Sequence, residues 1–158
     1  PPLDKEKDDF YVARFLSDCD KKIVCGGTSS QIVARYLGKE VSTSLDFIDK
    51  DIPPIGYIDG IDLTTEGVIT LRRLCELSYK YLSTSDLSSK DFTGARDGAG
   101  MLAQLLFEEA TEVVFFVGQS VNVAHQGLPI DTTMKLKLVE TLSKNLRLMG
   151  KKISVNYD

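Results

Sequence analysis

Three short polar segments hold the residues whose types and spacing could do chemistry. Each follows an apolar run, so in an α/β protein each would lie where a strand gives way to a helix or a loop. The segments are Gly26 to Ser30, Asp62 to Glu66, and Gln119 to Gln126. The residues within them that we expect to contact a ligand are Gly26, Gly27, Thr28, Ser29, Ser30, Thr64, Thr65, Glu66, Asn122 and His125.

The first segment is the most informative, because two glycines precede an expected helix start. Gly26 and Gly27 would let a ligand approach the backbone closely. Thr28, followed three residues later by Gln31, matches a capping box. Backbone N–H groups at an open helix start favour a phosphate or a carboxylate. A capped helix start with nothing bound explains the same residues, so both interpretations stay open.

Two specific phosphate-binding motifs are absent from this segment. A P-loop needs a Lys after its last glycine, and no Lys follows here. A cysteine-phosphatase loop would need an Arg at the position of Gln31, counted from Cys25. Cys25 could still be a reactive thiolate beside a helix start, but the pattern favours a cysteine buried in a strand.

The other two segments also allow two interpretations each. Asp62 and Glu66 could bind a metal ion or a sugar hydroxyl; alternatively, Thr64 or Thr65 caps the next helix and Glu66 complements its dipole. The only histidine, His125, lies near Asn122 and suits ligand contact or acid–base work. A hydrogen-bonded structural histidine is the alternative for that residue.

The elements that would position these segments alternate along the chain. We expect helices at 4–18, 29–37, 66–82, 97–110 and 131–149, and strands at 22–25, 40–45, 57–63, 112–118 and 152–157. Gly38 should end the second helix, and Ser83 to Arg96 should form the longest loop. The order predicts one α/β domain over residues 1–158, with a three-layer Rossmann-like arrangement around a mainly parallel central sheet.

Composition excludes several classes of protein. The net charge of −4 and the pI of about 5.1 argue against sequence-independent nucleic-acid binding. Three cysteines without a C-x-x-C pair argue against a structural zinc site and favour reduced thiols in the cytoplasm. No apolar run is long enough to span a membrane, and we expect no signal peptide. Because the chain begins Pro1-Pro2, we expect it to be a piece of a longer protein.

Motifs spread over nearly the whole chain resemble a known family. They are Cys25-Gly-Gly-Thr-Ser-Ser-Gln-Ile-Val-Ala-Arg35, the stretch from Pro53 to Leu71, Phe116-Val-Gly-Gln-Ser-Val-Asn-Val-Ala-His-Gln126, and Gly150-Lys-Lys-Ile-Ser-Val155. Together they resemble the C-terminal region of bacterial stage II sporulation protein E (SpoIIE)-family serine/threonine phosphatases.

The resemblance implies a parent protein with an N-terminal metal-dependent phosphatase domain. In that domain, aspartates of Asp-Gly signatures would hold Mn or Mg. Asp97-Gly98 echoes such a signature, but it lacks partner aspartates and the surrounding strands, so we do not transfer the metal site. We expect no cofactor in this fragment, and the attached phosphatase domain is its expected partner.

The expected function is that of an accessory or regulatory domain that binds a small anionic ligand or a partner at the carboxyl ends of the strands. Two alternatives stay open. The chain could be a small hydrolase or transferase that uses Cys25 or His125 with Asp62 or Glu66, which requires these groups to lie within hydrogen-bond reach. It could also be an interaction module that forms a homodimer.

Overall fold

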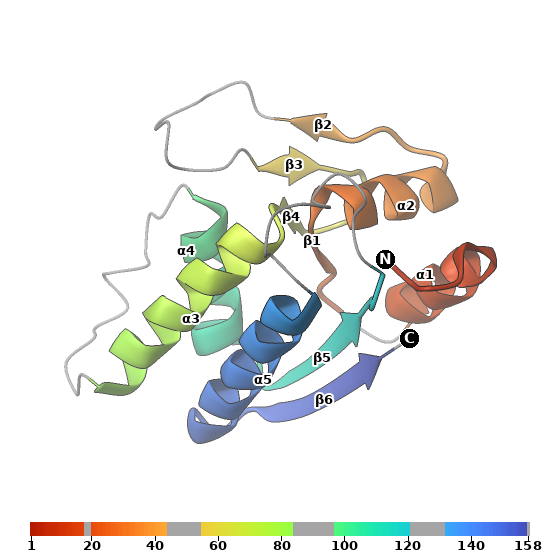
Figure 1. Cartoon of the computed structure of the whole chain (residues 1–158). Helices are drawn as coiled ribbons and strands as arrows, with labels where there is room; N and C mark the ends of the chain where they lie inside the picture. The colour runs from red at the N-terminus through yellow and green to blue at the C-terminus, as the bar shows by residue number, and fades with distance from the viewer. Residues whose placement is uncertain (18–19, 44–54, 84–96, 121–131, 158) are drawn as a thin grey trace.

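The computed structural model describes residues 1–17, 20–43, 55–83, 97–120 and 132–157. These residues form a mixed α/β protein, as the sequence predicts (Figure 1). The helical elements are the 3₁₀ turn η1 (Lys5–Lys7), α1 (Asp8–Ser17), α2 (Gly27–Leu37), α3 (Val68–Ser83), α4 (Gly98–Ala103), the π-helix η3 (Gln104–Glu109) and α5 (Thr132–Leu148). The strands are β1 (Ile23–Cys25), β2 (Ser42–Thr43), β3 (Gly56–Tyr57), β4 (Leu63–Thr65), β5 (Glu112–Val117) and β6 (Lys152–Tyr157).

The described strands form two sheets. The first has the order β1-β4-β3-β2, in which β1 and β4 are parallel and the two pairs that involve β3 are antiparallel. The second contains β5 and β6, which are parallel along their whole length. The helices α3, α4 and α5 lie on one side of the strands, and α1 and α2 lie toward the other (Figure 1). A single, mainly parallel sheet in a three-layer Rossmann-like arrangement stays a prediction.

The predicted strand at 57–63, interrupted by Gly60, is wrong as one strand, because only its two ends are strand residues. The chain instead leaves β3 at Tyr57, turns where Ile61 N–H donates to the carbonyl of Ile58, and enters β4 at Leu63. Gly60 lies in this turn with φ 93°, a conformation that glycine adopts at little cost. Residues 58–62, between β3 and β4, therefore form a turn and not a strand.

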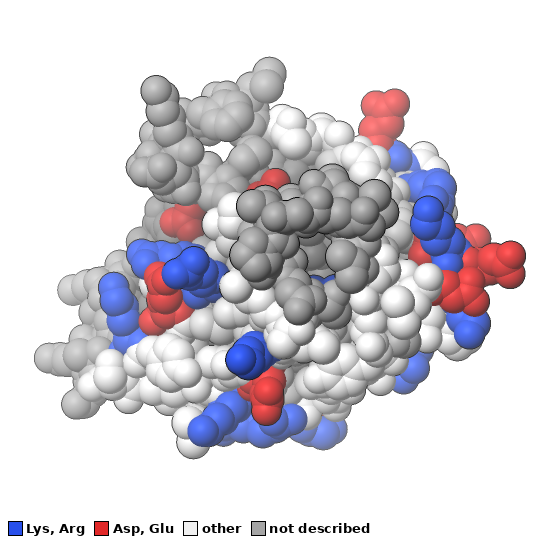
Figure 2. All heavy atoms as spheres, in the orientation of Figure 1, with Lys and Arg blue, Asp and Glu red and all other residues white. Residues whose placement is uncertain are grey.

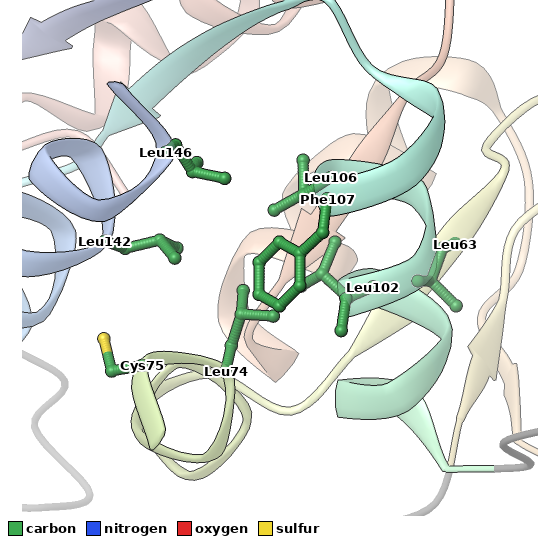
Figure 3. Close-up of a cluster of buried hydrophobic side chains, with 9 residues drawn as sticks. Leu63, Leu74, Cys75, Leu102, Leu106, Phe107, Leu142 and Leu146 are labelled. Atoms are coloured by element: carbon green, nitrogen blue, oxygen red, sulfur yellow. The ribbon is translucent and has the colours of Figure 1, made fainter. Parts of the chain in front are cut away.

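The main core lies between the strands and the helices α3, α4 and α5. Buried side chains from these helices, from η3 and from β4 point toward one another around the ring of Phe107 (Figure 3). They are Leu63, Leu74, Cys75, Leu102, Ala103, Leu106, Phe107, Leu142 and Leu146. Each fully buried leucine contributes about 1.5–3 kcal/mol relative to an exposed one, so this cluster fixes α3 and α5 against the strands.

A smaller core lies on the opposite face of β1. Val24 packs there with Val12 of α1 and Val33 of α2. An ion pair joins the same two helices, because Arg35 Nη2 lies 2.9 Å from the buried carboxylate of Asp8. The predicted end of α2 is confirmed: Gly38 adopts φ 63°, and its N–H donates to the carbonyls of Ala34 and Arg35.

Candidate functional site

The first two predicted segments follow neighbouring parallel strands. Cys25, the last residue of β1, lies in register with Thr65, the last residue of β4. Gly26 N–H then donates to the carbonyl of Thr65 over 2.8 Å. Because both strands end at the same edge of the sheet, the structure brings Gly26 to Ser30 together with Thr65 and Glu66.

Two glycines allow the two helix starts to approach closely. Gly26 immediately precedes α2, and Gly67 immediately precedes α3. A Cβ atom added to Gly67 would lie 3.4 Å from the Cα atom of Gly26, so the two backbones are in direct contact. Gly26 also has φ 115°, which other residues rarely adopt. The amino ends of two helices, of 11 and 16 residues, therefore meet at the carboxyl ends of β1 and β4.

The predicted capping box is wrong, because α2 starts before Thr28. Gly26 is the N-cap residue and has no side chain with which to cap the helix. Thr28 lies within the first turn and is exposed, while Ser29 is half-buried. Ser30 is buried, and its backbone N–H and its hydroxyl each donate to the carbonyl of Gly26 over 2.9 Å. Ser30 therefore stabilises the turn, and Gly27 is the exposed residue at its tip.

Thr64 and Thr65 are buried strand residues, so neither caps α3. The Thr65 hydroxyl lies 3.0 Å from the carbonyl oxygen of Glu66 and 3.4 Å from the sulfur of Cys25. The hydroxyl of Thr64 is buried without a hydrogen-bond partner, and its methyl group packs close to Gly56. Glu66 is exposed. Of Thr64, Thr65 and Glu66, only Glu66 is therefore open to solvent or to a ligand.

The structure does not favour a reactive thiolate at Cys25. Burial raises the pKa of its thiol, and the hydrogen bond from the Thr65 hydroxyl opposes this only in part. Cys25 ends a strand and packs against the main core. Cys25 thus ends a strand, as the sequence predicts, but its side chain is half-buried there, and its raised pKa disfavours the thiolate that an independent enzyme would use as a nucleophile.

Asp62 lies at the other end of β4, so its expected place beside Glu66 is wrong. Its carboxylate accepts hydrogen bonds from the backbone N–H of Lys22 at 2.8 Å and from the ammonium group of Lys21 at 3.0 Å. These hydrogen bonds lower the pKa of Asp62, and the bond from Lys22 N–H has the larger effect. Asp62 thus joins the amino ends of β1 and β4. It lies at the opposite end of these strands from Gly26 and Gly27, the glycine turn between β1 and α2.

The third predicted segment lies mostly outside the described residues, and Asn122 and His125 are both among those not described. The beginning of this segment is visible. Gly118 follows β5 in close contact with the carbonyl group of Pro1, which also accepts a hydrogen bond from Ser120 N–H over 3.1 Å.

Asp97, which echoes a phosphatase signature, has a structural role. It is the N-cap of α4, and its carboxylate accepts a hydrogen bond from Gly100 N–H over 2.8 Å. Within the described part of the chain, no three His, Cys, Asp or Glu side chains come together as a metal site. No described helix is both long and apolar enough to cross a membrane.

One surface hollow was not expected from the sequence. It lies beside β3, and its lining residues are Lys39, Glu40, Ser42, Tyr57, Ile58, Asp59, Gly60 and Ile61. Lys39 and Asp59 form an ion pair across 2.8 Å, which lowers the pKa of Asp59. These two exposed charges pair with each other, and the lining of the hollow includes none of the residues that we expected to contact a ligand, so the hollow is the weaker candidate.

Comparison with known proteins gives no relative: no family model, no curated protein and no solved structure matches this chain. The SpoIIE-family resemblance therefore stays a prediction.

Proposed function

We propose that this chain is an accessory or regulatory domain of a SpoIIE-like protein phosphatase, and that it binds a small anionic ligand at the glycine turn. The attached phosphatase domain, with its Mn or Mg, would be its partner in the cytoplasm. The family assignment rests on the sequence motifs, whereas the ligand-binding part rests on the geometry of the turn.

The observation that carries the proposal is the meeting of two helix starts at Gly26 and Gly67. Each helix start presents N–H groups without partners inside its own helix and about half a positive charge. The first residue of α2, Gly27, is exposed, and a Cβ atom added to it would meet no atom within 4 Å. A phosphate or carboxylate could therefore approach the first turn of α2 without displacing a side chain.

The neighbouring carboxylate narrows the kind of ligand. Glu66 is exposed one residue before Gly67, and its charge disfavours a bare anion at the same place. A ligand that carries hydroxyl groups beside its anionic group would suit both the start of α2 and Glu66. Its anionic group would meet the N–H groups of the helix start, and its hydroxyl groups would donate to the Glu66 carboxylate. Sugar phosphates and nucleotides have this combination, so we propose them ahead of inorganic phosphate.

Thermal unfolding of three proteins tests the site: the natural chain, Gly27→Glu, and the uncharged control Gly27→Gln. A carboxylate in the first turn of a helix is stabilising, so Gly27→Glu should be at least as stable as the control while it repels an anion. A ligand at about 100 times its Kd adds about 2.7 kcal/mol. For a chain of this length, we expect a rise in Tm of roughly 5–10 °C in the natural chain and in Gly27→Gln.

The same rise in Gly27→Glu would show that any ligand binds elsewhere. No rise with sugar phosphates, nucleotides or inorganic phosphate would remove the anion site altogether. The regulatory part needs a separate assay, in which the ligand changes the dephosphorylation rate of the full-length parent and fails to do so when Gly27→Glu is present.

We also propose that the two sheets act as one Rossmann-like layer. Two sets of contacts support this. The main core includes Ile23 of β1 together with Phe115 of β5. On the opposite face, Phe15 of α1 contacts the ring of Phe116 at 5.9 Å between centroids, while Val12 of the same helix packs on Val24. Nuclear Overhauser contacts between the backbones of β1 and β5 would test the arrangement, and their absence would leave two separate sheets.

A further inference from the structure

The free edge of β6 is a surface that the proposed anion site does not use. β6 pairs with β5 over six residues, from Lys152 opposite Glu112 to Tyr157 opposite Val117. No other described strand pairs with it. Figure 1 shows β6 as the outermost strand, with no described helix or strand beyond its free side.

The hydrogen bonds show which backbone groups face outward. Lys152 N–H donates to the carbonyl of Thr111 over 3.0 Å, so the amide of Lys152 faces the β5 side. Successive residues of a strand turn their N–H and C=O groups to alternate sides. Ile153, Val155 and Tyr157 therefore turn theirs toward the free edge, where they form a template for another strand.

Protection of this edge is slight. Natural edge strands are often interrupted by a bulge, a proline or several charges. The register of β6 runs without interruption, the strand contains no proline, and its one charged side chain, Lys152, stands at its first position.

Cations surround this edge although the chain as a whole has a net charge of −4. At the start of β6 lie Lys151, Lys152 and Arg147, whose Nη2 atom donates to the carbonyl of Ile153 over 3.4 Å. At the far end, Arg14 Nη2 donates to the side-chain oxygen of Asn156 over 3.2 Å. Figure 2 shows blue Lys and Arg spheres gathered along the lower edge, where α5 ends and β6 begins.

Among the described ion pairs, one acid contacts these cations: the carboxylate of Glu112 lies 3.0 Å from the ammonium group of Lys152. Arg147 holds one outward-facing group, the carbonyl of Ile153, whereas no described strand pairs with the outward-facing groups of Val155 and Tyr157. The edge therefore combines backbone groups open to a further strand with an excess of positive charge. We propose that β6 binds an extended, acidic peptide segment, which adds to the sheet as a further strand. Main-chain hydrogen bonds would hold the segment, and its carboxylates would face the surrounding cations.

Charge also decides against a second copy of this chain as the occupant. Antiparallel pairing of β6 with itself would bring the cations at its start, Lys151 and Arg147, toward the end of β6 where Arg14 lies in the other copy. Like charges that face each other across paired strands are destabilising. An acidic partner meets no such repulsion.

Two blocked six-residue peptides test the proposal: one alternates glutamate with valine, and the other alternates lysine with valine. Amide hydrogen exchange of the ¹⁵N-labelled chain reports where each peptide binds. We expect the glutamate peptide to slow exchange at Ile153 and Val155, to bind less tightly as salt is raised, and to bind roughly three- to tenfold more weakly to the double variant Arg147→Gln/Lys151→Gln. The lysine peptide should have no effect.

A backbone variant provides the matched control. Val155→Pro removes an outward-facing N–H and leaves the ladder to β5 intact, whereas Val155→Ala keeps that N–H. Proline should abolish binding of the glutamate peptide, and alanine should preserve it. If Val155→Pro does not fold, the charge variant still decides the question.

Three results would overturn the proposal. The first is no slowing of exchange by either peptide, and the second is equal binding of both peptides. The third is amide exchange at Ile153 and Val155 that slows as protein concentration rises, without any peptide, together with a dimer in light scattering. That result would assign the edge to a second copy of the chain.

Discussion

Replacing Gly98 with alanine should push the start of α4 away from β4. A Cβ atom at residue 98 would lie 2.8 Å from Cγ2 and 3.2 Å from Cβ of Thr65. Carbon atoms in contact prefer about 3.5–4.0 Å, so the added methyl group is roughly 0.7 Å or more too close. Overpacking of this kind costs about 1–3 kcal/mol. The better helix propensity of alanine returns up to about 1 kcal/mol, so the expected net loss is about 1–2 kcal/mol.

Urea unfolding of Gly98→Ala, Thr65→Ser and the double variant measures this contact. Serine removes the Cγ2 atom and keeps the hydroxyl that lies 3.0 Å from the carbonyl oxygen of Glu66. Thr65→Ser alone should lower the free energy of unfolding by about 1 kcal/mol, because a buried methyl group is lost. In the double variant the new methyl group occupies the freed space, so the two losses should not add. The reasoning fails if Gly98→Ala is as stable as the natural chain, or if the two losses add within about 0.5 kcal/mol.

Two further predictions concern buried ionisable groups. Arg35→Ala should lower the free energy of unfolding by about 1–3 kcal/mol, because it leaves the carboxylate of Asp8 buried without the guanidinium 2.9 Å away. Adding Asp8→Asn to this variant should recover part of the lost stability. A double variant less stable than Arg35→Ala would contradict this reasoning. Burial raises the pKa of the Cys75 thiol from 9.0 to about 11. Between pH 9 and 11, the thiol therefore keeps its proton in the folded chain and loses it in the unfolded chain. The free energy of unfolding should be unaffected by this thiol below pH 9 and should fall by about 2–3 kcal/mol as the pH rises to 11. Urea unfolding across this range should show a fall that is smaller in Cys75→Ala, and an equal fall in both proteins would refute the assignment.

Features set by local sequence could be predicted. The bounds of β6 agree with its alternating pattern from Lys152 to Tyr157. The end of α2 at Gly38 follows from the ease with which glycine adopts a left-handed conformation. In both cases the residues that decide the structure are neighbours in the sequence.

Features set by distant contacts could not be predicted in this way. Gly67 is separated in sequence from Gly26, and their contact exists only because β1 pairs with β4. The apolar residues Ile58, Ile61 and Leu63 predicted one strand interrupted by Gly60, whereas the turn at Gly60 separates two different strands, β3 and β4. The predicted capping box at Thr28 fits a local motif, but the β1 ladder ends at Cys25, and the helix begins two residues later, at Gly27.

The change from α4 to a π-helix at Gln104 also has no clear signal in the sequence. The residues of η3 include Leu106 and Phe107, which are buried in the main core. The wider turn is therefore associated with core packing, and helix propensity alone would not reveal it.

The unequal size of the two cores has a consequence for how the chain opens. Among the residues that the structure describes, nine buried hydrophobic side chains hold α3, α4, η3 and α5 to the strands, whereas three hold α1 and α2 to the other face of β1. The free energy of local opening depends on how much apolar packing is broken. The layer of α1 and α2 is thus the part of the fold that can detach first, while the remainder stays assembled. The glycine turn joins β1 to α2. A ligand bound there would therefore also raise the free energy needed to detach this layer.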